Sequence, residues 1–222
     1  MSEREEKPSK EPPPTVPKAV VSRLSLYLRE LQHWLREGKE TVSSTQLGKL
    51  LGFTDAQVRK DLAYFGQFGY PGIGYKCQEL IDAIKRILGT DRSWPVALVG
   101  CGNLGQALLG YRGFQLQGFD IVAAFDAAAH KVGQDLGTIQ IRPMSTFPEV
   151  AQEFGIRMVI LAVPAAVAQE VADTLVEAGV TGILNFAPVT LTLPRTVHVI
   201  GVDLAIEFEQ LAFAVVKGQG NQ

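Results

Sequence analysis

The sequence predicts an α/β protein built from two domains of different kinds. Three observations predict it: amphipathic helical stretches broken by glycines before residue 92, strand-like apolar runs alternating with helical stretches after residue 93, and opposite net charges in the two parts. Hydrophobic residues make up 46% of the 222-residue chain and charged residues 20%, which is ordinary for a chain that buries a core and excludes disorder throughout.

The net charge of −2 is unevenly distributed. Residues 1–16 carry three basic and four acidic side chains, residues 17–90 carry eleven and seven, and residues 91–222 carry seven and twelve. A basic segment joined to an acidic one indicates that only the first meets a polyanion such as nucleic acid.

Two short helices joined by a glycine turn are predicted after a long first helix. Pro17 precedes an amphipathic stretch over residues 18–37, which Gly38 ends. Ser44 is the expected N-cap of a second helix that ends at Gly52, and a third begins at Thr54 or Asp55 and stops at Gly66. This spacing is typical of a helix-turn-helix, whose second helix lies in the major groove of DNA.

The third helix has polar side chains suited to DNA. Val58, Leu62 and Phe65 form its predicted inner face, whereas Gln57, Arg59 and Lys60 point elsewhere, where they can reach phosphates or base edges. An Arg-Lys-Asp triplet by itself is usually a solvated helix face. Its place in a helix-turn-helix within the basic segment favours DNA binding, and we expect Ser44 to take part.

A glycine-rich stretch, residues 67–76, follows the third helix. It predicts a hairpin that serves as the wing of a winged helix, because glycines let a backbone approach a sugar-phosphate chain. We expect contacts from Gly74 and Tyr75, with Lys76 adding a positive charge. A fourth helix over residues 77–88 closes this domain.

The second domain begins with a buried strand, residues 96–99, followed directly by a GxGxxG loop formed by Gly100, Cys101, Gly102, Asn103, Leu104 and Gly105. Between a strand and a helix this pattern predicts a dinucleotide site: Gly100 allows the turn, Gly102 lets the backbone approach a pyrophosphate, and Gly105 permits close helix packing. Cys101 is expected to be a small apolar filler rather than a redox thiol.

The carboxyl end of the next strand, residues 121–126, indicates which kind of dinucleotide the site binds. Asp126 lies 21 residues after Gly105, where a carboxylate binds both adenosine ribose hydroxyls and repels a 2′-phosphate, so NADH and NAD⁺ are favoured over their phosphorylated forms. Lys131 flanks the adenosine in this prediction, although surface solvation explains it equally well. Asp120 opens the strand and is expected to be a solvated carboxylate.

Strands and helices continue to alternate to the end of the chain, which predicts a Rossmann-type parallel sheet. The ends of two apolar strands are predicted either to line a nicotinamide pocket or to form packing turns. The residues at these ends are Val163, Pro164, Asn185 and Phe186. A final amphipathic helix begins at Leu204, and its apolar stripe must be covered by its own sheet or by a second copy of the chain.

Catalytic groups are not found where a dehydrogenase needs them. None of His33, His130 and His198 lies at a strand end beside the predicted nicotinamide, and a single helix after residue 203 leaves no room for a substrate domain. A sensor is therefore favoured over an enzyme. A small NAD-dependent dehydrogenase and a cofactor-free dimerisation scaffold on a DNA-binding head remain alternatives.

The same sequence bounds the domains and the surroundings of the protein. We expect a disordered tail over 1–16, a DNA-binding domain over 17–92, a nucleotide-binding domain over 93–203 and a dimerisation helix with a short tail over 204–222. Two cysteines without a CxxC pair exclude a cysteine-rich metal site, and a chain without a signal or membrane-spanning segment is expected in the cytoplasm.

Taken together, these motifs resemble one known family. Over about residues 17–217 the chain resembles bacterial Rex proteins, which are redox-sensing transcriptional repressors. The resemblance is carried, in this order, by SSTQLGKLLGFTDAQVRKDLAYFGQFGYPGIGY, ALVGCGNLGQALLGY, FDAAAHKVG, ILNFAPV and GVDLA. The resemblance implies a homodimer of winged-helix and Rossmann domains, with an exchanged C-terminal helix, that binds operator DNA when NADH is scarce.

The resemblance also implies roles for individual residues. Arg59, Lys60, Gly74 and Tyr75 match DNA contacts, and the three motif glycines with Asp126 match cofactor contacts. In addition, Arg23, Tyr111 and Asp203 match positions that couple the cofactor to domain orientation. Many Rex proteins have an aromatic residue after this aspartate, where this chain has Leu204.

Overall fold

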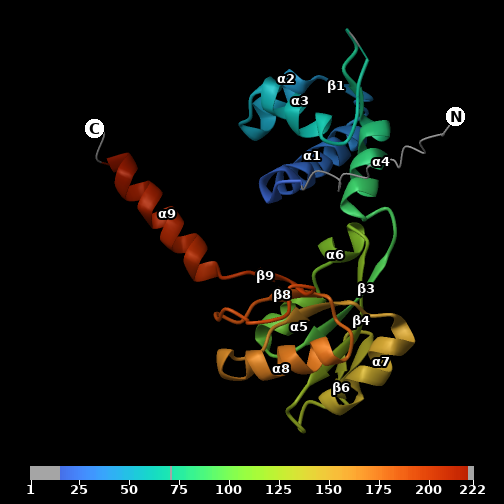
Figure 1. Cartoon of the computed structure of the whole chain (residues 1–222), viewed down its shortest axis with the longest axis vertical. Coiled ribbons are helices and arrows are strands. Elements are labelled where there is room, and N and C mark those ends of the chain that lie inside the picture. Colours follow the sequence, from blue (N-terminus) through green and yellow to red (C-terminus); the bar gives the residue numbers. More distant parts are fainter. Residues whose placement is uncertain (1–15, 71, 220–222) are drawn as a thin grey trace, which may run out of the picture. The chain divides into compact units, whose positions relative to one another are not determined.

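The computed structural model describes residues 16–70 and 72–219. The chain divides into two compact units between Asp91 and Arg92, coloured blue to green and green to red in Figure 1. The predicted tail over 1–16 lies outside the described residues except for Val16.

The first unit consists of four helices and a two-stranded sheet. Its helices begin and end close to the predicted positions, because glycines at Gly52 and Gly89 adopt the left-handed conformation that ends α2 and α4. The elements are α1 Lys18–Arg36, β1 Thr41–Val42, α2 Ser44–Leu51, α3 Asp55–Ala63, β2 Tyr75–Lys76 and α4 Cys77–Leu88.

One correction concerns the start of α2. Its N-cap is Ser43 rather than Ser44: the Ser43 hydroxyl accepts the backbone N–H of Gln46, and the Gln46 side chain accepts the Ser43 N–H. This reciprocal capping box uses a glutamine three residues after the cap, which sequence reasoning overlooked. Ser44 therefore begins the helix, and its hydroxyl is available to other partners.

The wing of the first unit is pinned to the strand before α2. Val42 pairs with Tyr75 and Thr41 with Lys76 in an antiparallel ladder. Gly74 has a φ of +91°, and a Cβ there would lie 2.5 Å from the Val42 carbonyl oxygen, so only glycine fits this crossing.

The second unit is a seven-stranded sheet in the order β5-β6-β4-β3-β7-β8-β9. All neighbours are parallel except β5 and β6, which form an antiparallel pair that the sequence did not predict. The chain order turns back at β3, which pairs with both β4 and β7. The strands are β3 Trp94–Val99, β4 Phe119–Asp126, β5 Asp135–Leu136, β6 Ile139–Pro143, β7 Met158–Leu161, β8 Gly182–Asn185 and β9 His198–Gly201.

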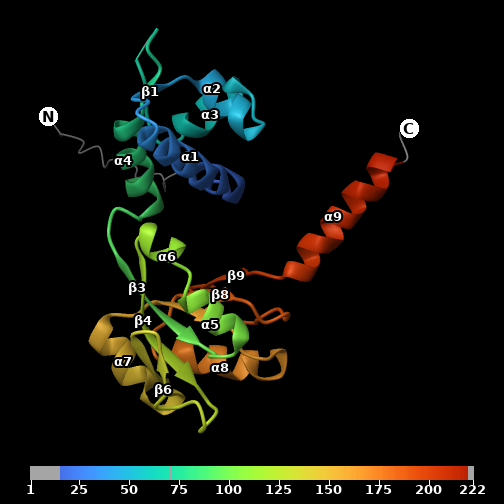
Figure 2. The same cartoon turned by 180° about the vertical axis from the view of Figure 1, so that it is seen from behind.

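Helices cover the two faces of this sheet unequally. On one face α7 and α8 pack over a continuous apolar core, and on the other α5 and α6 pack over β3, β4 and β6; Figures 1 and 2 show these two sides in turn. The helices are α5 Asn103–Leu109, α6 Gly113–Leu116, α7 Phe147–Phe154, α8 Ala165–Glu177 and α9 Leu204–Gln219, with a short 3₁₀ turn at Met144–Thr146.

The connection from β8 to β9 contains no helix, so part of the second sheet face stays open. An apolar hollow of about 340 Å³ lies there. It is lined by side chains of β3, β4, β7, β8 and β9 together with Phe114 of α6.

Candidate functional site

The exposed face of α3 carries a cation held in place by two neighbours. The Arg59 guanidinium donates to the Asp55 carboxylate at 2.7 Å and to the Ser44 hydroxyl at 3.1 Å. The side chains of Arg59 and Lys60 are both exposed, as predicted for groups that meet DNA. The structure therefore brings Ser44 and Arg59 together across the helix pair, and Lys60 is exposed on the same helix as Arg59.

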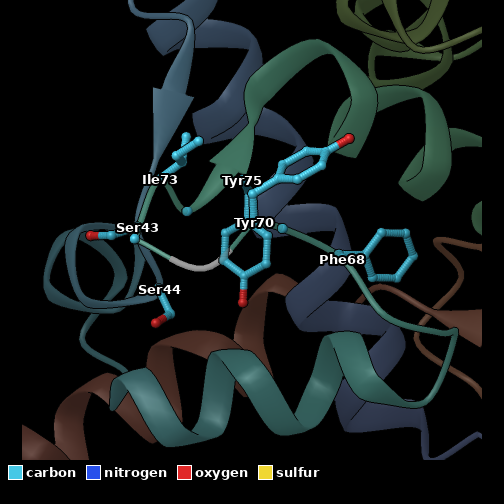
Figure 3. A pocket seen from close by; sticks show the side chains of 9 residues that line it. Ser43, Ser44, Phe68, Tyr70, Ile73 and Tyr75 are labelled. Carbon is cyan, nitrogen blue, oxygen red and sulfur yellow. The ribbon is translucent and has the colours of Figure 1, made fainter.

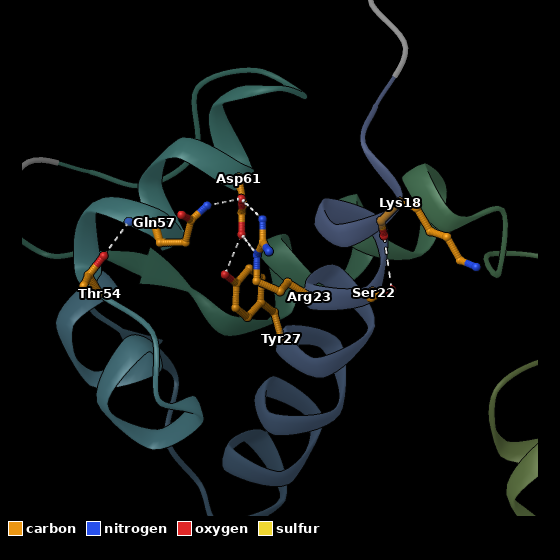
Figure 4. Close-up of polar contacts among 7 residues, drawn as sticks. All are labelled: Lys18, Ser22, Arg23, Tyr27, Thr54, Gln57 and Asp61. Atoms are coloured by element: carbon orange, nitrogen blue, oxygen red, sulfur yellow. Dashed lines mark hydrogen bonds and ion pairs between the residues drawn. The ribbon is translucent and has the colours of Figure 1, made fainter. Parts of the chain in front are cut away.

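Gln57 has a different neighbourhood from the one that the sequence predicts. Its amide nitrogen Nε2 donates to Oδ1 of Asp61 at 2.7 Å, one helical turn later. Figure 4 shows Gln57 directed toward a cluster of polar side chains between α3 and α1.

Asp61 is the centre of this cluster and was not singled out from the sequence. It is 0% exposed, and its carboxylate also accepts two hydrogen bonds from Arg23, at 2.5 and 2.8 Å, and one from the Tyr27 hydroxyl at 2.8 Å. Burial raises the pKa of Asp61, but the hydrogen bonds from Arg23, Tyr27 and Gln57 outweigh burial and hold the pKa below its usual value. The carboxylate is thus charged, buried and fully paired.

A sequence signal for Asp61 existed. Asp61 lies three residues after Val58 and directly before Leu62, and both of these apolar residues belong to the predicted inner face of the helix. A carboxylate on a buried face needs a partner. Arg23, on the first helix, is the cation that meets it.

The wing presents a different set of side chains from the one expected. Tyr75 is only 8% exposed, because its pairing with Val42 turns the ring into the core of the unit, so a direct contact of this ring with DNA does not fit the structure. In the described part of the wing, the large apolar or aromatic side chains that are exposed are Tyr70 and Ile73, the latter 61% exposed, while Lys76 pairs with Glu79 at 2.8 Å.

A hollow of about 470 Å³ separates the wing from the start of α2. Figure 3 shows Ser43 and Ser44 from the start of α2 and Tyr70 and Ile73 from the wing around this hollow. Backbone and hydroxyl groups therefore converge beside the exposed end of the helix pair, where a sugar-phosphate chain could be accommodated.

The glycine loop of the second unit has the geometry that a dinucleotide requires. A Cβ on Gly105 would lie 2.0 Å from the Gly100 carbonyl oxygen, and one on Gly100 would lie 2.4 Å from that of Ala162, so neither position accepts a side chain. A Cβ on Gly102 would meet nothing within 4 Å. The loop is tightly packed from behind and open in front, which fits a pyrophosphate approaching Gly102.

Asp126 is tied directly to this loop. Its carboxylate, 9% exposed, accepts the N–H groups of Cys101 and Ala128, both at 2.8 Å, and Lys131 at 2.9 Å. Burial raises the pKa of Asp126, and these three donors lower it by more, so the group is ionised. Asp126 and Lys131 thus lie together at the end of β4, beside the loop.

Cys101 behaves as the predicted filler. Its thiol is buried, and burial together with the Asp126 carboxylate raises the pKa to about 11. A thiol of this kind is protonated and unreactive at neutral pH.

The remaining predicted pocket residues gather at the carboxyl edge of neighbouring strands. Val163 follows β7 and lies against the glycine loop, since a Cβ on Gly100 would be 3.0 Å from its Cγ1. Pro164 follows it and is exposed, whereas Asn185 is buried and uses its amide to hold Ala187 and Val189 in the loop after β8. Phe186 next to it is half-buried.

The three residues assigned to coupling have different surroundings within their own units. Arg23 is paired with Asp61 in the first unit, and the Asp203 carboxylate accepts the N–H of Ala205 at the start of α9. Tyr111 lies at the far end of α5 from the glycine loop, packed edge-on to Phe114, beside the amino end of β4. Asp120, at that same end, accepts a hydrogen bond from the Ser93 hydroxyl.

The described residues form neither a metal-binding cluster nor a membrane-spanning helix. Among residues 16–70 and 72–219, no group of three or more His, Cys, Asp or Glu side chains is placed to hold a metal ion. Within the described part of the chain, no helix has the length and hydropathy needed to cross a bilayer.

Both units match known families. A family model described as a CoA binding domain matches residues 91–189, and one described as a putative DNA-binding protein N-terminus matches residues 15–63. Two curated relatives carry the name redox-sensing transcriptional repressor Rex. One, from Carboxydothermus hydrogenoformans, is 48% identical over 90% of this chain and 96% of its own length, and the other, from Chloroflexus aurantiacus, is 45% identical over 91% and 96%.

Solved structures agree with this similarity over nearly the whole chain. The crystal structure of RSP in complex with β-NAD⁺ and operator DNA superposes with a TM-score of 0.87 at 33% identity, covering 92% of this chain and 94% of the other. The crystal structure of RSP in complex with β-NADH gives 0.84 at 31% identity, covering 92% and 96%.

Proposed function

This chain belongs to the Rex family of redox-sensing transcriptional repressors, and we propose that it acts as a homodimer that binds palindromic operator DNA and leaves it when NADH binds. It is a DNA-binding repressor with NADH and NAD⁺ as its ligands, and not an enzyme. The dehydrogenase and the cofactor-free scaffold are therefore wrong as alternatives.

The observation that carries the proposal is the pairing of Asp126 with the glycine loop. A carboxylate fixed at the end of β4, beside an unobstructed Gly102, suits an adenosine ribose and a pyrophosphate on neighbouring strands. We assign cofactor binding to Gly100–Gly105, Asp126 and Lys131. We assign DNA binding to Ser44, Arg59, Lys60 and the wing backbone at Gly74, with Gln57 at the start of the recognition helix.

The two nucleotides must be distinguished by their nicotinamide rings, since they share every phosphate and ribose. The oxidised ring is cationic and the reduced ring is neutral. Val163, Pro164 and Phe186 offer an apolar edge that disfavours a cation, because burying an unpaired charge costs free energy. A tenfold preference for NADH requires only about 1.4 kcal/mol of this difference.

NADH must then bind one arrangement of the dimer better than the other, because a ligand shifts a conformational equilibrium only through differential affinity. We propose that NADH closes the pair of nucleotide domains. Closure moves the two recognition helices off a half-site spacing of about 34–36 Å. Arg23, Tyr111 and Asp203 are our candidates for coupling the nucleotide to this movement.

Two exposed apolar surfaces support the homodimer. Every side chain of α9 from Leu204 to Lys217 is exposed, including Phe208 at 71%, and the sheet of the same unit has its apolar hollow under β7 to β9. Exposed apolar surface of this extent marks an interaction site. We propose that a second copy covers both, with α9 exchanged between the copies.

We retain the domain boundaries as part of the proposal: DNA binding by residues 17–92, nucleotide binding by residues 93–203 and dimerisation by residues 204–222. A repressor of bacterial operators works where the chromosome lies, so the proposed location is the cytoplasm.

The test uses the full chain without added nucleotide on two duplexes, one with an inverted repeat and one with a single half-site. We expect one dimer per inverted repeat, measured by light scattering and gel shift, and much weaker binding to the half-site. Equal affinity for both duplexes, or a monomeric complex, would contradict the homodimer.

A further inference from the structure

The amide of Gln57 is held in one orientation by a buried charge. Its Nε2 donates to Oδ1 of Asp61 at 2.7 Å. An ionised carboxylate only accepts hydrogen bonds, so turning the amide over would bring its oxygen Oε1 against a carboxylate oxygen. The nitrogen must therefore face Asp61, as Figure 4 shows.

Asp61 is itself unable to turn or to lose its charge easily. Besides Gln57, it accepts two hydrogen bonds from Arg23 and one from Tyr27, so the roughly four acceptor positions of a carboxylate are all used. Tyr27 is fully buried on α1, and the Arg23 guanidinium braces both carboxylate oxygens. The orientation of Gln57 is thus fixed from a second helix.

This arrangement leaves Oε1 of Gln57 on the side of the amide that faces away from Asp61. Among the described residues, the fully buried side-chain oxygen or nitrogen atom that lacks a hydrogen-bond partner is Oγ1 of Thr90, and Oε1 of Gln57 is therefore not an atom of this kind. Gln57 is half-buried, and its Oε1 takes no hydrogen bond from the described residues. Gln57 is the third residue of α3, and the first turn of a recognition helix is the part that contacts base edges.

The exposed polar side chains of α3 are donors. Arg59 and Lys60 are cations, and the Asp55 carboxylate already accepts from Arg59 and from the N–H of Ala56. Oε1 of Gln57 is therefore an acceptor of fixed direction on a helix whose exposed polar side chains are donors. In the major groove the groups that donate to such an acceptor are the exocyclic amino groups of adenine (N6) and cytosine (N4).

We propose that Asp61 is a positioning residue for operator recognition, which locks the Gln57 amide so that one fixed position on the contacted strand of each half-site must be adenine or cytosine, the bases with an exocyclic amino group. An unlocked glutamine could turn over and donate to guanine O6 or thymine O4. The locked glutamine presents its Oε1 to guanine O6 or thymine O4, and these bases are disfavoured because two hydrogen-bond acceptors repel each other. This inference rests on the proposed DNA binding by α3.

The experiment is a selection by the full-length chain from a duplex library with randomised inverted half-sites, followed by sequencing of the bound fraction. Wild type should enrich adenine or cytosine over guanine and thymine at one position of each half-site, by on the order of tenfold. Gln57→Met should lose the preference at that position alone.

Two variants of the cluster separate positioning from plain stability. Asp61→Asn keeps the shape of the side chain, but its amide can donate to Oε1 of Gln57 and so allows the Gln57 amide to turn over. The enrichment ratio of adenine or cytosine over guanine or thymine should therefore fall toward one at the base position that Gln57 contacts, while the other base positions stay selective. Tyr27→Phe removes a different hydrogen bond of Asp61 and leaves Gln57 held, so it should keep the wild-type preference. Thermal unfolding of each variant confirms that the preference is measured on folded protein.

Each outcome is decisive. Unchanged base preferences in both Gln57→Met and Asp61→Asn, with weaker binding to all sequences, would overturn the positioning role while leaving DNA binding intact. The same would follow if Tyr27→Phe relaxed the preference as much as Asp61→Asn. Failure of wild type to enrich any sequence would instead overturn DNA recognition by α3 itself.

Discussion

The Asp126 carboxylate and the backbone N–H of Cys101, 25 residues apart, are joined by a hydrogen bond of 2.8 Å that ties the end of β4 to the glycine loop. A ligand that contacts both therefore meets a preformed surface. Such a surface lowers the ordering cost of binding, because the loop does not have to be fixed when the nucleotide arrives.

Asp126→Asn should weaken NADH binding at least about tenfold, or 1.4 kcal/mol. The amide loses the charge that binds ribose hydroxyls and loosens the contact with Cys101. Calorimetric titration with NADH measures the effect, and gel shifts should show a repressor that stays on DNA at NADH concentrations that release wild type. Asp120→Asn, at the opposite end of the same strand, is the matched control and should bind NADH normally.

The glycines of the loop should separate folding from binding. Gly102→Ala places its methyl in open space at an ordinary φ of −77°, so the fold should keep its melting temperature while NADH affinity falls. Gly105→Ala drives a methyl into the Gly100 carbonyl and should lower stability by about 1–3 kcal/mol. Equal melting temperatures for the two variants would contradict this division.

Arg59→Ala should weaken operator binding by about 1–3 kcal/mol and reduce its dependence on salt. Ser44→Ala should have a smaller effect in the same direction, because it removes one of the two groups that orient the guanidinium. Fluorescence anisotropy at several salt concentrations measures both. Arg86→Ala, an exposed arginine of α4, controls for loss of a charge anywhere in the unit.

The first unit should lose stability in acid through Asp61. Burial raises the pKa of this carboxyl, but its hydrogen bonds to Arg23, Tyr27 and Gln57 leave it below the unfolded value of about 3.9. Its contribution to the free energy of unfolding is thus complete above that value and is lost as pH falls through the lower, folded pKa. Urea unfolding below pH 5 should show a shallower pH dependence for Asp61→Asn than for wild type, and identical slopes would contradict the assignment.

Charged substitutions on α9 should break the dimer. Phe208→Asp places a carboxylate in a surface that the proposed partner covers, so the protein should elute as a monomer and bind an inverted repeat no better than a half-site. Glu209→Gln, a polar change on the same helix, should stay dimeric. A dimeric Phe208→Asp protein with normal DNA binding would place the interface elsewhere.

Most of the fold could be predicted because its signals are local. The helix ends at Gly52 and Gly89, the strand before Gly100 and the position of Asp126 all follow from residues near each other in sequence. The cluster around Asp61 could not be predicted in this way, since Arg23 and Asp61 are 38 residues apart and their contact depends on how α1 packs on α3. The inward turn of Tyr75 has the same origin, because it comes from a two-residue ladder with β1.

The most direct test of the account is a DNA-binding titration on an inverted-repeat duplex with NADH and NAD⁺ added separately to the full-length protein. The account predicts that NADH releases the protein, whereas NAD⁺ at the same concentration leaves it bound. Release by both nucleotides at the same concentration, or by neither, would contradict the claim that the charge of the nicotinamide ring controls DNA binding.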